Sequence, residues 1–325
     1  MTILQFALQY NLERVFGHDF KDCSLFSSKV GPSIQDKHTL QLAQSSMTLE
    51  NGKYCVGIPW KQNPVNLPLN KEIALRRLNG LAKRFEKDSK LFTAYSTEMK
   101  KFIDSGFIEV SRSDDTDLCH FIPHHPVWHP RKGSLRIVWD CAVSLNDFIY
   151  EGPDLLNQLT EVLIRFRRFR YAITSDIRKM YLNVKVPPRD RGALRILWWP
   201  DNDMSKPPIE YRAAVHIYGA KSSGFVANLC VHDLAKGVND SILSDVLTKD
   251  LYVDDQATSM QFEDEAVSLV SDLSALLSKG GFHLTKFVSN SKTVVSSFPE
   301  EDQGLGQSEF NHSILGLNWN VQTDE

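Results

Sequence analysis

The sequence predicts an α+β protein in which three aspartates gather at one edge of a sheet. Residues 171–175 are β-prone, and Asp176 follows them directly. Residues 251–253 and 256–260 predict the two strands of a short hairpin with Asp254 and Asp255 at its tip. Helical patterns occupy the chain on either side of these strands. This order of elements allows the three carboxylates to meet.

Hydrophobic periodicity predicts the remaining elements in chain order. Residues 1–45 carry little pattern, and residues 47–60 predict a hairpin around an Asn51-Gly52 turn. Apolar residues spaced by three and four predict helices over residues 71–85, 89–105, 155–166 and 266–277. A further helix is expected over residues 225–234, after a turn of small residues. β-prone runs predict strands from residue 107 and over residues 135–139, 194–199, 209–215, 282–288 and 314–319. We divide the chain into segments 1–45, 46–110, 111–300 and 301–325.

The composition is that of an ordinary globular protein. The 325 residues are 42% hydrophobic and 24% charged, and the net charge of −3 gives no global basic signal for nucleic acid. Five cysteines lack any C-x-x-C pair, which indicates a reducing compartment. No apolar run approaches the roughly 18 residues of a membrane span. The start of the chain lacks a signal-peptide core. We therefore expect an intracellular, cytoplasmic protein with no membrane partner.

Adjacent carboxylates at a hairpin tip are costly unless a cation lies between them. Asp254 and Asp255, with Asp176 as a third carboxylate, are suitable ligands for divalent metal ions. Two Mg²⁺ ions, with Mn²⁺ as a substitute, could activate a 3′-hydroxyl and stabilise a leaving pyrophosphate there. A solvated Asp-Asp turn without a metal is the alternative.

Basic residues gather between Glu161 and Arg195, where ten lysines and arginines accompany three acidic residues. The group begins with Arg165, Arg167, Arg168 and Arg170. Phosphate contacts and a solvated face explain such a group about equally well. Arg136 is flanked by apolar residues, so its side chain either snorkels to the surface or reaches a triphosphate.

Two further motifs have structural alternatives. Gly219 opens a turn of small residues that includes Ser222 and Ser223, which suits either close approach of a partner or a serine-capped helix start. A zinc site beside Cys119 is the other hypothesis, with His120, His124, His125 and His129 as candidates. We do not favour zinc, because the spacings match no standard pattern and three prolines indicate extended chain.

Ten motifs, in order, resemble one family. They are "ENGKYCVGIPWK" near residue 50, "FIPHHPVWHP" near 120, "LRIVWD" ending at Asp140, "SLNDFIYEGPDLLNQL", "VLIRFRRFRYAITSDIRKMYLNVKV", "RILWW", "IEYRAAVHIYGAKSSGF", "LYVDD", "LLSKGGFHLTKFVSNS" and "LGLNW". From about residue 46 to its end, the chain resembles reverse transcriptases of BEL/Pao-type long-terminal-repeat retrotransposons (the Pao family). Gly224 stands where a proline is usual in the family.

The resemblance implies a right-hand polymerase with fingers and palm, a ferredoxin-like βαββαβ palm core with an antiparallel sheet, and no thumb. It makes residues 46–110 the lead into the fingers, 111–300 the fingers-palm domain, and 301–325 a primer-grip-like strand and truncated end. It implies metal binding and catalysis by Asp176, Asp254 and Asp255, with Lys286 as a general acid. For nucleotide binding it implies Arg136, Lys132 as a weaker candidate, Tyr181 beneath the sugar, the backbone of Ile177, and Gly219, Ser222 and Ser223.

The expected activity is RNA-directed DNA polymerisation, in which a primer 3′-OH attacks a deoxynucleoside triphosphate. The expected partners are an RNA or DNA template-primer, touched by the arginines 165, 167, 168 and 170, and dNTP. The rest of a polyprotein (protease, ribonuclease H and integrase) is a further partner if the chain is not a standalone product. A retroelement particle or the nucleus is an alternative location. The alternative function is that of a truncated or domesticated remnant that binds nucleic acid or a protein without polymerising.

Overall fold

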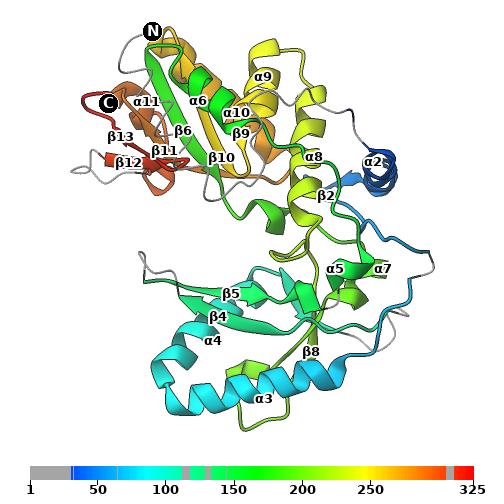
Figure 1. Ribbon diagram of the computed structural model, residues 1–325. Helices are drawn as coiled ribbons and strands as arrows, with labels where there is room; N and C mark the ends of the chain where they lie inside the picture. Colours follow the sequence, from blue (N-terminus) through cyan, green and yellow to red (C-terminus); the bar gives the residue numbers. More distant parts are fainter. Residues whose placement is uncertain are drawn as a thin grey trace.

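The chain folds around two main hydrophobic cores, one on a four-stranded sheet and one on the helices of the N-terminal half (Figure 1). The computed structural model describes residues 31, 33–63, 65–111, 118–128, 133–143, 145–304 and 311–325. Lys132, His129 and the segment 1–30 therefore lie outside the described residues. Within the described part, no helix is long and apolar enough to cross a membrane.

The central sheet has the strand order β11–β6–β10–β9, and every neighbouring pair is antiparallel. Its strands are β6 (Tyr171–Ile177), β9 (Leu251–Tyr252), β10 (Asp255–Met260) and β11 (Leu284–Ser289). Helices α8 (Ser223–Lys236) and α9 (Ser241–Lys249) connect β6 to β9, and α10 (Glu263–Ser278) connects β10 to β11. The connection from β6 to β9 also contains residues 178–222, whose strands at Arg195–Trp198 and Ile209–Ala213 belong to another sheet. Without these residues and α9, the order is the βαββαβ that the resemblance implies, and the α+β class is confirmed.

The two faces of the central sheet meet different partners because side chains alternate along each strand. Ile173 of β6 packs in the core that includes α8 and α10. Ala172, on the opposite face, packs with Trp319 and with helix α6 (Leu159–Phe166). Trp319 belongs to the hairpin of β12 (Asn311–Ile314) and β13 (Leu317–Asn320). Asp176 lies on this second face, since it follows Ala172 by an even number of residues.

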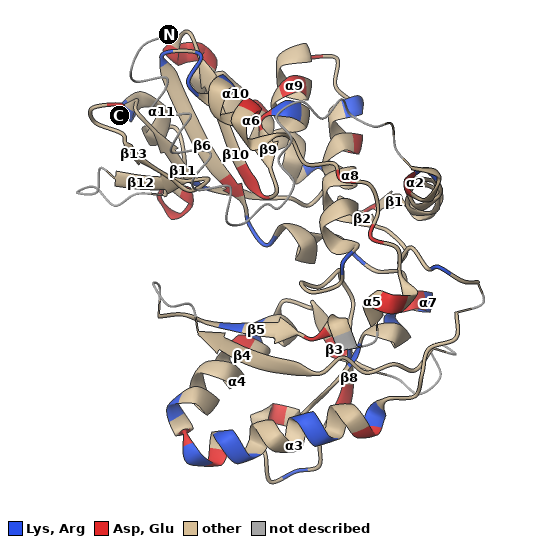
Figure 2. Cartoon of the chain, in the orientation of Figure 1, with Lys and Arg blue, Asp and Glu red and all other residues tan. Residues whose placement is uncertain are grey.

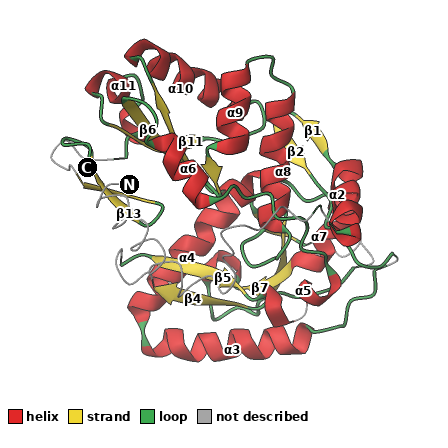
Figure 3. Cartoon of the chain, turned by 45° about the horizontal axis from the view of Figure 1, so that its top comes forward, coloured by secondary structure: helices red, strands yellow, loops and turns green. Residues whose placement is uncertain are grey.

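The second core joins two long helices to two small sheets. The helices are α3 (Lys71–Lys87) and α4 (Ser89–Asp104), and the Asp88 side chain caps α4 by accepting from the backbone N–H of Leu91. One sheet has the order β3 (Ile108–Val110), β8 (Ile209–Ala213), β7 (Arg195–Trp198), and the other pairs β4 (His124–Trp128) with β5 (Leu135–Trp139). Helix α3 packs against β7 and β4 and forms the edge of the molecule below them (Figure 3).

Short elements complete the chain. They are β1 (Thr48–Glu50), β2 (Lys53–Cys55), α5 (Leu145–Phe148), α7 (Pro188–Arg191), α11 (Lys292–Ser296) and the 3-10 turns η1 (Cys141–Val143), η2 (Met180–Asn183), η3 (Gly192–Leu194), η4 (Pro200–Asn202) and η5 (Glu300–Asp302). The β1–β2 hairpin turns at Asn51 and Gly52, which both have positive φ. This is the turn that Asn-Gly predicts.

Three predictions of local structure were wrong. The poorly patterned N-terminal segment contains α2 (Ile34–Ser46), which begins with a capping box formed by Ser33 and Asp36. The single strand predicted over residues 314–319 is the β12–β13 hairpin, because Leu315 and Gly316 turn the chain with φ of 48° and 84°. The helix predicted from residue 155 begins at Leu159, after a turn in which the Asp154 side chain accepts from Leu156 N–H.

Candidate active site

Three aspartates lie at one edge of the central sheet, as the sequence predicted. Asp176 of β6 is the register partner of Asp255 in β10. Side chains of such partners point to the same face of an antiparallel sheet. Asp254 precedes Asp255 in the β9–β10 turn, and its carbonyl accepts a 2.8 Å hydrogen bond from the backbone N–H of Ile177. This bond ties the turn to the end of β6.

The surroundings of Asp254 act on its pKa in opposite directions. Burial raises the pKa of the Asp254 carboxyl, and the negative charge of Asp176 raises it further. Lys286 and Arg136 oppose this increase because their positive charges favour the ionised carboxylate. Burial is thus the main reason that Asp254 resists ionisation, and a cation bound at this edge would favour its ionised form.

The turn that presents Asp254 is strained. Val253 has a φ of 57°, in the left-handed region that a β-branched side chain rarely enters. Such outliers persist where the surrounding structure holds them, and they are frequent at functional sites. The strands on both sides of the turn and the bond from Ile177 provide that constraint.

Lys286 reaches the aspartates from β11 because of a β-bulge. The pairing register of β11 with β6 shifts between Thr285 and Val288, and Lys286 has a φ of 56°. Its ammonium donates a 2.7 Å hydrogen bond to Oδ2 of Asp176. Gly304 packs against the bulge: a Cβ at this position would lie 2.5 Å from the carbonyl oxygen of Lys286. Glycine is thus required there to keep this backbone.

Two tyrosines stand beside the aspartates. The rings of Tyr181 and Tyr218 lie 5.1 Å apart at an angle of 39°. Burial raises the pKa of Tyr218 to about 12, with help from the negative charges of Asp254 and Asp176. A Cβ at Gly224 would lie 3.2 Å from the Tyr181 hydroxyl, so a larger residue at this position would crowd the Tyr181 side chain. Sequence reasoning selected Tyr181 but missed Tyr218, although Tyr218 directly precedes the small-residue turn.

Arg136 lies on β5, next to the second core, and its charge acts on Asp254 and Tyr218. Its side chain is exposed while both neighbours along the strand, Leu135 and Ile137, are buried. The Arg136 guanidinium lowers the pKa of Asp254 and of Tyr218, which places its positive charge within electrostatic reach of both. The contact of Arg136 with a triphosphate stays a prediction, and its position beside Asp254 and Tyr218 is compatible with it.

The small-residue turn is shaped by backbone requirements. Gly219 has a φ of 101°, and a Cβ there would lie 2.4 Å from the carbonyl oxygen of Trp139. Asn146 Nδ2 donates to the Gly219 carbonyl at 3.0 Å. Ser222 and Ser223 are both buried, and the Ser223 hydroxyl donates to the Ile217 carbonyl at 2.8 Å. The side chain of Ser223 thus braces the turn.

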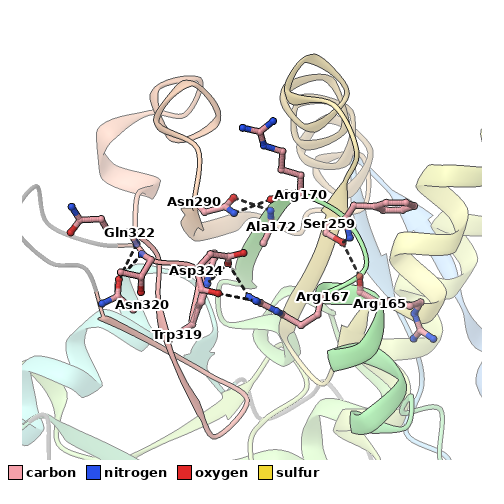
Figure 4. Close-up of polar contacts among 12 residues, drawn as sticks. Arg165, Arg167, Arg170, Ala172, Ser259, Asn290, Trp319, Asn320, Gln322 and Asp324 are labelled. Carbon is pink, nitrogen blue, oxygen red and sulfur yellow. Dashed lines mark hydrogen bonds and ion pairs between the residues drawn. The ribbon is translucent and has the colours of Figure 1, made fainter. Parts of the chain in front are cut away.

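The predicted template-contacting arginines lie at the opposite end of β6 from Asp176, and two of them form ion pairs within the chain. Figure 4 shows Arg167 beside its partner Asp324. Arg165 Nε donates to Asp250 at 2.5 Å, and Arg167 pairs with Asp324 at 2.9 Å. Arg168 and Arg170 lie over the neighbouring rings of Phe169 and Tyr171 and remain exposed.

Two of the histidines near Cys119, His120 and His124, are buried and form hydrogen bonds within the fold. His124 is buried, which lowers its pKa to about 4, so it is neutral at pH 7. Its Nε2 donates to the Leu197 carbonyl at 3.0 Å, and its Nδ1 accepts from the Tyr95 hydroxyl at 2.5 Å. His120 Nδ1 contacts the Pro68 carbonyl at 3.2 Å. No group of three or more His, Cys, Asp or Glu side chains positioned to hold a metal ion exists among the described residues, so the zinc hypothesis has no support there.

Solved structures with a similar arrangement come from foamy virus. The foamy viral protease-reverse transcriptase in complex with dsDNA aligns with a TM-score of 0.52 over 73% of this chain and 41% of its own length, at 16% identity. The chain therefore has a reverse-transcriptase-like fold. The native prototype foamy virus protease-reverse transcriptase aligns with a TM-score of 0.47 over 61% of this chain and 24% of its own, at 19% identity. The chain thus spans less than half of either neighbour. No protein-family model and no curated protein matches the sequence.

The donor chemistry of the sheet edge fits a hard divalent cation. Mg²⁺ is usually held by one or two carboxylates together with substrate phosphates and water, rather than by a complete protein cage. Asp176 and Asp254 offer such a pair, even though no three-ligand group exists among the described residues. The predicted set of three converging metal ligands is therefore present as an edge of three aspartates but not as a preformed cage.

Proposed function

We propose that this chain is the fingers and palm part of an RNA-directed DNA polymerase from a BEL/Pao-type retroelement. The observation that carries the proposal is the meeting of Asp176 and Asp254 beside Lys286 and Arg136 at the edge of an antiparallel sheet. The central sheet is the palm, and the second core with the β4–β5 hairpin forms the fingers. A reverse-transcriptase-like fold at a TM-score of 0.52 supports the proposal.

The reaction is nucleotidyl transfer. The primer 3′-hydroxyl loses its proton to solvent and its oxygen forms a bond to the α-phosphorus of a dNTP. The bond from that phosphorus to the bridging oxygen breaks, and pyrophosphate leaves. Asp176 and Asp254 would hold two Mg²⁺ ions, or Mn²⁺, with Asp255 and the backbone of Ile177 as assisting donors. When bound, Mg²⁺ lowers the pKa of the primer hydroxyl and neutralises charge on the triphosphate.

The other residues bind the nucleotide and the template and exclude ribonucleotides. Arg136 pairs with triphosphate oxygens through its planar guanidinium, and Lys286 donates a proton to the leaving pyrophosphate. The Tyr181 ring lies beneath the sugar and excludes a ribose 2′-OH. The backbone of the turn at Gly219, Ser222 and Ser223 cradles the nucleotide, and Arg168 and Arg170 are the template contacts that remain exposed.

A primer-extension assay tests this proposal. Purified protein is given a primed RNA template, the four dNTPs and Mg²⁺, and we expect extension of the primer. Asp254→Asn removes one of the two central carboxylate charges and is expected to abolish extension. Asp272→Asn makes the same chemical change at an exposed position of α10 and is expected to retain it. Equal extension by the wild type and Asp254→Asn would refute the assignment.

The ion pair of Lys286 with Asp176 supports a second candidate function. A protein whose central carboxylate is held by its own lysine could bind nucleic acid without polymerising it, as a domesticated remnant would. Gel-shift titrations at several salt concentrations, run beside the extension assay, separate the two functions. Binding with a steep salt dependence and no extension favours the remnant.

A further inference from the structure

Helix α3 carries a concentration of basic side chains at the outer boundary of the second core. Its lysines and arginines appear as blue segments along the lower edge of the molecule (Figure 2). Gly80 lies at the centre of this group, since Arg76 and Arg77 precede it by four and three residues and Lys83 and Arg84 follow it by three and four. Residues at these spacings are neighbours on a helix surface. We call the exposed group of Arg76, Arg77, Gly80, Lys83, Arg84 and Lys87 the Gly80 surface.

The side of α3 that packs against the core is different from the Gly80 surface. Ala74, Leu78, Leu81 and Phe85 face the core, and their positions lie on the opposite side of the helix from Arg76 and Lys83. Within the described residues, the five cations of the Gly80 surface have no ion pair, whereas Lys71 at the start of the same helix pairs with Glu210 at 2.6 Å. Helix α3 holds six lysines and arginines against two acidic residues, Glu72 and Glu86, in a chain whose net charge is −3, so positive charge is in excess on this helix.

Gly80 itself has no packing role in the fold. A Cβ at this position would meet no atom within 4 Å, and the residue does not need a positive φ. Glycine in a helix interior is less favourable than alanine. The helix C-terminus favours Arg84 and Lys87 in the last turn. That effect does not reach Arg76 and Arg77. The result is bare helix backbone surrounded by cations, which helix stability does not explain.

We propose that the Gly80 surface binds the phosphate backbone of a nucleic-acid strand at a site separate from the aspartates. Guanidinium groups match phosphate oxygens with paired hydrogen bonds, and the missing side chain at Gly80 lets a strand approach the helix. From Arg76 to Lys87 the surface is about 17 Å long, which is the axial length of about five nucleotides of one strand. Such contacts carry no sequence information. The choice of nucleic acid as the partner rests on the proposed function.

Equilibrium binding in the presence of EDTA tests the surface independently of polymerisation. The probe is a fluorescently labelled single-stranded RNA several tens of nucleotides long, titrated by anisotropy over a series of NaCl concentrations. The test variant is Arg76→Gln/Arg77→Gln. The matched control is Lys100→Gln/Lys101→Gln on α4, which removes the same charge from lysines that pair with Asp104 and Glu98. Gly80→Glu adds a side chain and a negative charge while favouring the helix, so its melting temperature is expected not to fall.

We expect the slope of log affinity against log salt to become shallower by about 1.4 for Arg76→Gln/Arg77→Gln, since each lost phosphate contact to a single strand removes about 0.7. The α4 control is expected to keep the wild-type slope, and Gly80→Glu to bind more weakly without loss of stability. Equal slopes for the test and control variants would overturn the proposal. Binding of the same proteins to phosphatidylserine vesicles is measured as well. The proposal would also be overturned if Arg76→Gln/Arg77→Gln lost vesicle binding while its RNA binding stayed unchanged. Failure of primer extension by the wild type would refute the proposed polymerase without changing these slopes.

Discussion

The ammonium of Lys286 lies 2.7 Å from a carboxylate oxygen of Asp176, so one central carboxylate of the site is engaged by a cation of the chain itself. The contact depends on the bulge in β11 that gives Lys286 its left-handed backbone, and Gly304 packs against that bulge. The Lys286 side chain is 58% exposed, whereas that of Asp176 is 18% exposed. The lysine is therefore free to move away when another cation reaches Asp176.

Removing this internal cation is expected to strengthen divalent metal binding. Lys286→Met should lower the apparent Kd for Mn²⁺ by about two- to fivefold, because an ion pair with one exposed partner is weak but competes directly. Lys292→Met, at an exposed position of α11, should leave the Kd unchanged. Electron paramagnetic resonance of free Mn²⁺ measures both. Weaker binding by Lys286→Met would mean that the lysine supports the metal site rather than competing with it.

Tyr218 is expected to act on nucleotide binding through its ring. Tyr218→Ala removes the partner of the Tyr181 ring and should raise the KM for dNTP by about three- to tenfold, the range expected for an aromatic pair. Tyr218→Phe keeps the ring and should stay within about twofold of the wild type. Steady-state single-nucleotide kinetics give both values. A KM that rises equally in the two variants would assign the effect to the hydroxyl.

The strained turn at Val253 predicts a gain in stability on substitution. Asparagine tolerates the left-handed region better than valine, so Val253→Asn should increase the free energy of unfolding by about 1 kcal/mol. Val253→Ile keeps the β-branch and should give no gain. Urea denaturation followed by circular dichroism compares the three proteins. Lower stability of Val253→Asn would show that the valine side chain contributes more through packing than its backbone costs.

Asp254 is expected to lower stability at neutral pH. Its pKa is raised in the fold by burial and by Asp176, so the folded state holds its proton more tightly than the unfolded chain. Wild-type stability is therefore lost as the pH rises through the raised pKa, whereas Asp254→Asn does not titrate. The variant should melt at a higher temperature than the wild type at pH 7, and the difference should close below the ordinary aspartate pKa of about 3.9. A difference that persists at low pH would point to packing instead of charge.

The central sheet and the edge of aspartates could be predicted because local pattern determines them. Asp176 follows a β-prone run, and Asp254 and Asp255 sit between two such runs, so antiparallel pairing places them together. The helices α3, α4 and α10 have apolar spacings that require one buried face. The pattern of the chain alone was sufficient for these elements.

Other features depend on contacts between distant parts of the chain. Tyr218 joins the site because its ring meets Tyr181, which no spacing reveals. Lys286 reaches Asp176 through a bulge, and a bulge leaves no mark in an alternating pattern. Arg165 and Arg167 are engaged by Asp250 and Asp324, which lie far away in the sequence. The charge of a residue could be read from the sequence, but not its partner.

The most direct test of the central claim is single-turnover incorporation of one dNTP by the wild type, Asp176→Asn, Asp254→Asn and the double variant. If the two aspartates act as one unit, each single variant should lose at least about a hundredfold in rate, and the double variant should lose little more. Losses that multiply in the double variant would show that the two carboxylates act separately. Incorporation at the wild-type rate by either single variant would contradict the account.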